Sequence, residues 1–77
     1  MREWRVLFSR KDAVLSDLRA IEIHGLRFYD ILYSAGEPGA APESARIGAE
    51  MIYANPRAGD RVMIERVANV VMRVDKL

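Results

Sequence analysis

The chain has 77 residues, 51% of them hydrophobic and 30% charged, and its twelve basic and eleven acidic residues leave a net charge of +1. This is the composition of one small globular domain, and the near-neutral total excludes a general electrostatic attraction to nucleic acid. Without cysteine, disulfides and thiolate metal sites are excluded, and we expect a reducing compartment, the cytoplasm.

The chain contains no apolar run that approaches the roughly 18–20 residues of a membrane-spanning helix. The apolar run near the N-terminus is also too short for the core of a signal peptide. We therefore expect neither export nor a membrane partner. A single core of this size supplies only about 3–5 kcal/mol of net stability, so self-association is an expected supplement.

The first element expected is a strand over residues 4–9. Trp4, Val6 and Phe8 occupy every second position, which is typical of a strand with one buried face. Trp4 could offer a ligand a stacking platform, but a lone Trp in phase with Val and Phe in so small a domain is more typical of a core.

Residues 9–25 fit two structures. Ser9 with Asp12 resembles a helix capping box, and the apolar residues at helical spacing that follow are Val14, Leu15, Leu18 and Ile21. The alternative is a hairpin that turns at His24-Gly25 and continues as a strand over 26–33. One register then forms four favourable cross-strand pairs: Ile23–Leu26, Glu22–Arg27, Ile21–Phe28 and Arg19–Asp30. We favour the hairpin, with room for a short helical turn at residues 10–17.

Residues 42–55 carry the strongest helix signals. Pro42 suits the first helical position, and Glu43 suits the positive end of the helix dipole. Asn55 followed by Pro56 is a typical helix stop. The residues that would share one helix face are Ile47, Gly48, Met51, Ile52 and Asn55.

The C-terminal stretch again allows two structures. Turn signals at residues 58–60 and at Ala68-Asn69 separate two β-branched runs, which predicts a hairpin over 61–66 and 70–75. The rival is a helix over 60–77 with Asp60 as its N-cap. Its apolar residues at helical spacing are Met63, Ile64, Val67, Val70, Val71, Val74 and Leu77. The abundance of β-branched residues favours the hairpin.

Together these elements predict an α+β fold: a single domain over 1–77, in which an antiparallel sheet of four or five strands packs one face against the 42–55 helix. The expected core consists of Trp4, Val6, Phe8, Ile21, Phe28, Ile47, Met51, Ile52, Ile64 and Val71. Charge placed at Met51 should then abolish folding, because it would be buried without a partner.

The residues that could perform catalysis are few. His24 is the only histidine, it falls in a turn, and it has no carboxylate at ligand spacing. No serine lies in a nucleophile-elbow or Ser-x-x-Lys context, and no glycine loop has the spacing of a phosphate-binding loop. We therefore expect a protein that is not an enzyme and that has no cofactor, no metal site and no small-molecule substrate.

These features favour a non-catalytic protein-interaction module, such as an assembly subunit or a small inhibitor or regulator of the kind that phages and mobile elements make. Arginine and tyrosine are enriched in binding hot spots. The residues expected on the interaction surface are Arg57, Arg61, Arg66, Arg73, Tyr29 and Tyr33. The alternative is a nucleic-acid-binding protein in which the four arginines form a patch on the C-terminal hairpin.

Overall fold

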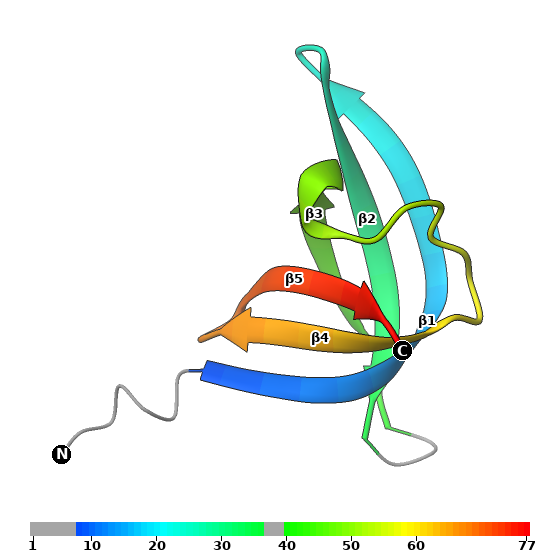
Figure 1. Cartoon of the computed structure of the whole chain (residues 1–77), viewed down its shortest axis with the longest axis vertical. Helices are drawn as coiled ribbons and strands as arrows, with labels where there is room; N and C mark the ends of the chain where they lie inside the picture. Colours follow the sequence, from blue (N-terminus) through cyan, green and yellow to red (C-terminus); the bar gives the residue numbers. More distant parts are fainter. Residues whose placement is uncertain (1–7, 37–39) are drawn as a thin grey trace, which may run out of the picture.

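The computed structural model describes residues 8–36 and 40–77, which form one antiparallel sheet of five strands (Figure 1). The strands are β1 (Phe8–Ile23), β2 (Leu26–Ala35), β3 (Glu43–Gly48), β4 (Arg61–Val67) and β5 (Val70–Lys76), in the spatial order β3-β2-β1-β4-β5. Within the described ranges the only helical element is one 3₁₀ turn, η2 (Ala49–Met51). The predicted α+β class is therefore wrong, and the fold is a β-sheet.

The predicted helix over 42–55 is wrong, because its first half is the edge strand β3. Tyr29 lies opposite Ile47 and Ile31 opposite Ala45, so pairing with β2 fixes this segment as a strand. Ala45 and Ile47 are two positions apart and share one side of β3, which is the period of a strand. The helical spacing of the apolar residues in this segment obscured that period. Asn55 does adopt the left-handed conformation expected of it, with φ 57°, but in a loop rather than at a helix end.

The predicted hairpin at His24-Gly25 is confirmed. Both turn residues have positive φ, 52° and 80°, as a tight two-residue turn requires. All four expected pairs occur in the predicted register: Ile23–Leu26, Glu22–Arg27, Ile21–Phe28 and Arg19–Asp30. The helical turn allowed at residues 10–17 and the rival helix over 9–25 are wrong, since this whole segment belongs to β1.

The C-terminal hairpin is also confirmed. β4 and β5 pair around Ala68-Asn69, and Ala68 takes the positive φ of 55° that the tight turn needs. The rival helix over 60–77 is wrong. Of the predicted strand over 4–9, residues 4–7 lie outside the described part of the chain, and Phe8 and Ser9 begin β1.

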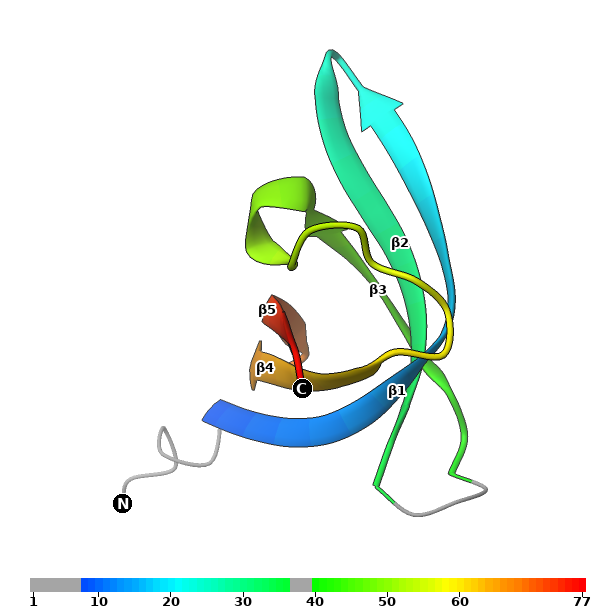
Figure 2. The same ribbon diagram turned by 45° about the vertical axis from the view of Figure 1, so that its right-hand side comes forward.

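β1 is shared by both halves of the sheet and lets it roll up. Its beginning pairs with β4 through Val14, its remainder pairs with β2, and a β-bulge at Ser16 lies where the two halves meet. β4 and β5 consequently run across β2 and β3 (Figures 1 and 2). The outer strands approach each other where Ile52 forms a parallel bridge with Val74.

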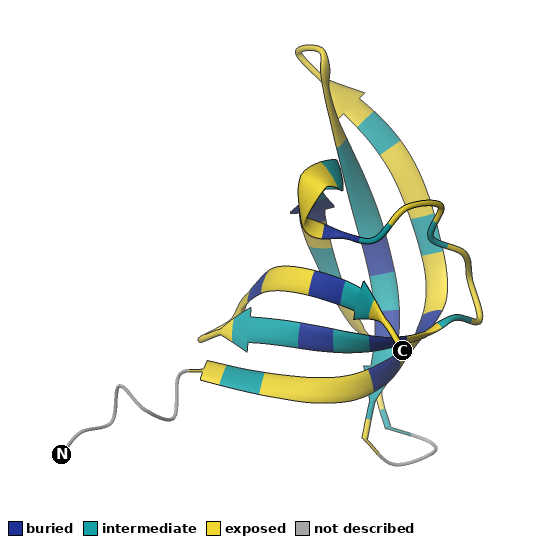
Figure 3. Ribbon diagram, in the orientation of Figure 1, coloured by how far each residue is buried: buried dark blue, intermediate teal, exposed yellow. Residues whose placement is uncertain are grey.

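The core fills the inside of this roll (Figure 3). Its buried residues are Ala13, Leu15, Ile31, Tyr33, Ile47, Ile52, Val62, Ile64, Val71 and Val74. Four of the ten predicted core residues, Ile47, Ile52, Ile64 and Val71, are thus confirmed.

The other core predictions have different outcomes. The assignment of Phe8 to the core is wrong, since its side chain is 52% exposed. In the first part of β1, odd-numbered residues face inward and even-numbered residues face outward. The assignment of Met51 to the core is also wrong, since its side chain is 41% exposed. The reason for expecting that a charge at this position abolishes folding therefore no longer holds. Ile21 and Phe28 are only half-buried and lie on the outer side of the sheet. Trp4 and Val6 lie outside the described residues.

The loop between η2 and β4 closes one end of the roll. Gly59 donates a backbone hydrogen bond to the carbonyl of Leu15 (2.7 Å), and the Leu15 N–H donates to the carbonyl of Asp60 (2.9 Å). The Tyr53 hydroxyl donates to Oδ2 of Asp60 at 2.5 Å. Burial, together with this hydrogen bond, raises the pKa of Tyr53 to about 12, and the same bond lowers the pKa of Asp60.

Candidate interaction surface

The hairpin of β1 and β2 projects beyond the roll (Figure 1). Its strand register places four apolar side chains on its outer side. Ile21 lies opposite Phe28, and Ile23 lies opposite Leu26, which forms a continuous patch that we call the outer apolar face. Leu26 is 63% exposed and Ile23 is 37% exposed. No residue from 16 to 30 is among the buried core.

The same hairpin has an open strand edge. β4 pairs with β1 only as far as Val14, and the loop bonds described above occupy Leu15. Beyond that point no described strand pairs with the side of β1 that faces away from β2. We call residues 18–23 on this side the β1 edge.

An ion-pair row crosses the outer side of the sheet next to the outer apolar face. Arg46 donates two hydrogen bonds to Asp30, from Nε to Oδ1 at 2.7 Å and from Nη2 to Oδ2 at 3.1 Å. These bonds hold the pKa of Asp30 below its ordinary value. Arg19 lies opposite Asp30 on the other flank, is exposed, and has no ion-pair partner among residues 8–36 and 40–77.

Two shallow, open depressions lie side by side along this row and share Asp30, Ile31 and Ser44 in their linings. The other lining residues are Asp17, Leu18, Arg19 and Leu32 in the first, and Ala45 and Arg46 in the second. Across the two linings the carboxylates of Asp17 and Asp30 balance the guanidiniums of Arg19 and Arg46. Such a surface suits a mixed polar contact with a macromolecule better than it suits an enclosed small-molecule ligand.

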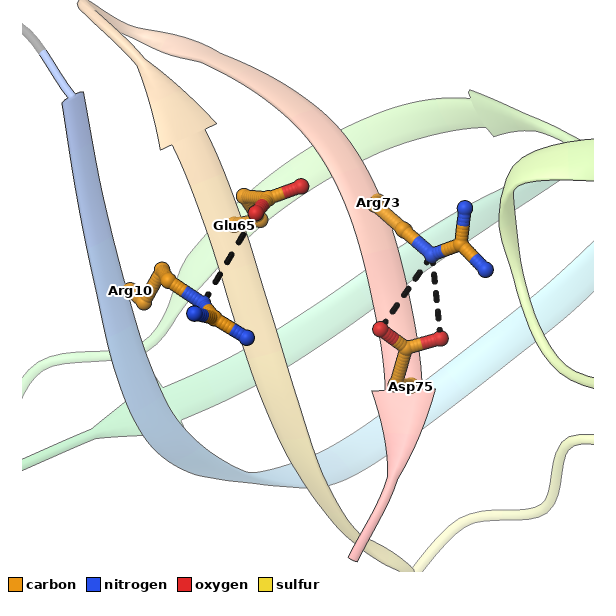
Figure 4. A network of polar contacts seen from close by, with 4 residues as sticks. All are labelled: Arg10, Glu65, Arg73 and Asp75. Carbon is orange, nitrogen blue, oxygen red and sulfur yellow. Dashed lines mark hydrogen bonds and ion pairs between the residues drawn. The ribbon is translucent and has the colours of Figure 1, made fainter.

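The structure does not bring the six predicted surface residues onto one face. Arg66 points to the inner side of β4, whereas Arg73 lies on the outer side of β5, because a bulge between them changes the phase of the strand pair. On the outer side, Arg73 is bound to Asp75 and the neighbouring Arg10 is 3.7 Å from Glu65 (Figure 4).

The two predicted tyrosines face the interior. Tyr33 is 2% exposed, and its hydroxyl donates to Oε1 of Glu43 at 3.1 Å. Arg66 donates to the same oxygen from Nη1 at 2.8 Å, so this carboxylate joins β2, β3 and β4. Burial, and then the contact with Glu43, raises the pKa of Tyr33. Tyr29 packs against the core, so neither tyrosine presents its ring as a flat external surface.

Arg57 and Arg61 are both exposed and flank the turn that leads into β4. They lie at the closed end of the roll, because the loop between them bonds to Leu15. His24 is at the exposed tip of the projecting hairpin. Within the described ranges, no three His, Asp or Glu side chains lie close enough together to hold a metal ion.

Sequence reasoning placed the residues of the outer apolar face correctly in register but assigned Ile21 and Phe28 to the core. The pairing pattern says which side chains share a side of a sheet, and it does not say which side other strands cover. The one available signal was that Ile23 and Leu26 flank the turn directly, where little of the sheet can reach them.

Comparisons with protein-family models, with curated proteins and with solved structures give no match to this chain. Among residues 8–36 and 40–77, no helix has the length and apolar character needed to cross a membrane.

Proposed function

We propose that the protein is a non-catalytic protein-interaction module that binds its partner through the outer apolar face of the projecting hairpin. The observation that carries this proposal is the set of four apolar side chains, Ile21, Ile23, Leu26 and Phe28, which lie together on a part of the sheet outside the core. Contiguous exposed apolar patches on small domains mark interaction sites.

The energetics of the fold support the same reading. Leu26 and Ile23 keep much of their surface in water, so they add little to a core whose net stability is small at this chain length. Burial against a partner would release about 25 cal/mol for each Å² of apolar surface covered. The ion pair of Asp30 and Arg46, with Arg19 beside it, borders the face and supplies the polar rim that interfaces have.

The alternative is binding of nucleic acid by Arg57, Arg61, Arg66 and Arg73. Small partly open barrels of five strands include oligonucleotide-binding proteins, although architecture alone does not decide function. Of the four arginines, Arg66 and Arg73 are each bound in an ion pair and lie on opposite sides of the sheet. This arrangement gives the alternative less support than the hairpin gives to protein binding.

A photo-crosslinking amino acid at position 26 tests the proposal in cells, with the same amino acid at position 27 as the matched control. Leu26 and Arg27 are adjacent and both exposed, but their side chains point to opposite sides of the hairpin. We expect a discrete protein adduct from position 26 only, lost in the double variant Ile21→Lys/Ile23→Lys.

Equal adducts from both positions, or none from position 26, would contradict the proposal. Binding of single-stranded oligonucleotides that weakens steeply with salt, and that is lost in Arg57→Ala/Arg61→Ala, would instead establish the alternative.

A further inference from the structure

We infer that the partner contributes an extended strand, which pairs in antiparallel orientation with the β1 edge and adds a sixth strand to the sheet. This inference rests on the proposed function and specifies the partner's chemistry. Strand addition to an exposed edge gains affinity from main-chain hydrogen bonds and specificity from alternate side chains.

The backbone of the β1 edge has unpaired groups in the right places. Residues that flank a two-residue turn form a hydrogen-bonded pair, so Ile23, and every second residue before it, bonds to β2. Ala20 and Glu22 therefore turn their N–H and C=O groups toward the open side. Leu18 agrees with this phase, because its N–H is bound by the Asp17 side chain at 2.9 Å rather than by β2.

The other two outer edges of the sheet are less available. β3 and β5 approach each other across the opening of the roll, where Ile52 bridges to Val74 and the Tyr53 N–H donates to the Val74 carbonyl (3.2 Å). The β1 edge has no such covering segment in the described part of the chain.

The side chains of the β1 edge specify what the added strand should carry. On the outer side the order of side chains along the edge is Arg19, Ile21, Ile23, of which Ile21 is half-buried. Both oxygens of Asp30 are already engaged by Nε and Nη2 of Arg46, so the guanidinium of Arg19 is left to attract an acidic residue. The matching antiparallel strand reads apolar-x-apolar-x-acidic, with its apolar side chains extending the outer apolar face.

A second copy of this chain fits the same edge poorly. In a two-fold antiparallel pair, side chains on one side must meet side chains of the same side. Three of the registers centred within the edge place Arg19 opposite itself, Ile21 or Ile23. A fourth sets Ile21 opposite Ile23, but it shortens the ladder to the residues next to the turn and places Glu22 opposite Glu22 of the other copy, which is a pair of like charges. The register that pairs Arg19 with Asp17 brings Leu15 into the ladder, where Asp60 and Gly59 already occupy its N–H and C=O. The occupant is therefore a strand of a different protein.

Synthetic peptides test the inference directly on the full chain. The probe is a short peptide with the order Val-Thr-Val-Thr-Glu, and the controls are the reversed order and a peptide with Lys in place of Glu. We expect the first peptide to bind most tightly and to slow amide hydrogen exchange at Ala20 and Glu22, which exchange fast in the free protein. Equal binding of all three peptides, or exchange at these amides that is already slow without peptide, would overturn the inference.

Two variants separate backbone pairing from side-chain recognition. Ala20→Pro removes an edge N–H while leaving the bonds to β2, and Ala20→Val retains it. We expect Ala20→Pro to weaken binding by about tenfold or more, and Ala20→Val to bind as the parent does. Unchanged binding in a folded Ala20→Pro would overturn the inference.

A charge exchange provides a second test that does not depend on Ala20→Pro folding. Arg19→Glu should bind the Glu peptide about twofold to fivefold more weakly and should prefer the Lys peptide. Loss of binding to both peptides by a folded Arg19→Glu would contradict the assignment. If position 26 still gives its protein adduct while none of the peptides binds, strand addition is overturned and the proposed function stands. A dimer that Ala20→Pro dissociates would show that the occupant is a second copy.

Discussion

The two ends of β1 belong to regions of opposite character. Its beginning lies in the rolled half, with β4, β5 and the closing loop, where Leu15 and Val62 are completely buried. Its end lies in the projecting hairpin, over residues 17–30, which holds no core residue and carries the outer apolar face. Stability is thus concentrated in the first region, whereas the second adds only the partly buried Leu18 and Tyr29 to the core, so its outer side can serve binding without cost to the core.

The sharpest test of this difference compares two truncations in one strand. Leu15→Ala removes a fully buried side chain and should lower the free energy of unfolding by about 2–5 kcal/mol, enough to unfold a domain of this size. Ile23→Ala, in the projecting hairpin, should change it by only about 0.5 kcal/mol. Urea denaturation followed by circular dichroism measures both, and similar losses in the two variants would remove the distinction.

A smaller effect is expected where the roll is closed by polar contacts. Glu43→Ala leaves the buried Tyr33 hydroxyl and the Nη1 of Arg66 without their acceptor, which should cost about 1–3 kcal/mol. The matched control is Glu22→Ala in the projecting hairpin, whose 3.7 Å pair with Arg27 is exposed and should contribute at most about 0.5 kcal/mol. Thermal melts in which the two variants behave alike would contradict this account.

The loop that closes the rolled half should make stability depend on alkaline pH through Tyr53, which lies outside the projecting hairpin. Tyrosine in the unfolded chain ionises near its ordinary pKa of 10, whereas Tyr53 keeps its proton up to about pH 12. The unfolded state therefore loses its proton first, and the stabilisation from this group, complete below pH 10, is lost between pH 10 and 12. Tyr53→Phe should show a flatter alkaline profile of unfolding free energy than the parent.

Asp60, which accepts the hydrogen bond of the Tyr53 hydroxyl, should affect stability at acidic pH. The pKa of Asp60 lies below its ordinary 3.8, so its stabilisation is present above that value and falls as the pH drops through the folded pKa. Asp60→Asn should remove part of this acid dependence. An acid profile that matches the parent's would show that the closing loop gains nothing from the carboxylate.

The hairpin at His24-Gly25 could be predicted from sequence because several cross-strand pairs, such as Ile21–Phe28 and Glu22–Arg27, agreed on one tight turn. The C-terminal hairpin could be predicted because two β-branched runs flank the turn signal at Ala68-Asn69. The rival helices arose from the two bulges. One extra residue at Ser16 places the inward-facing Leu15 and Leu18 three positions apart, which is helical spacing. Met72 has the same effect between Val71 and Val74. A bulge has no local signature here, so alternation in the sequence could not reveal it.

The segment 42–55 failed for a different reason. Its Pro42, Glu43 and Asn55 satisfy the local rules for helix ends, but β2 needs a neighbour on its free edge, and pairing of Ala45 and Ile47 with it outweighs those preferences. For the candidate surface, Arg19 and Ile23 could be placed in register. That the hairpin extends beyond β3 and β4, and is therefore uncovered, depends on strand lengths that pairing rules do not fix.

The chain's C-terminus lies at the base of the roll, where the Leu77 N–H is held by the Arg61 carbonyl at 3.0 Å, and the His24-Gly25 turn lies at the far end of the molecule (Figure 1). A linker, dye or biotin attached after Leu77 would therefore leave the hairpin pointing away from the attachment point. Immobilisation through this end leaves the outer apolar face and the β1 edge accessible, which suits surface-based binding measurements and display formats.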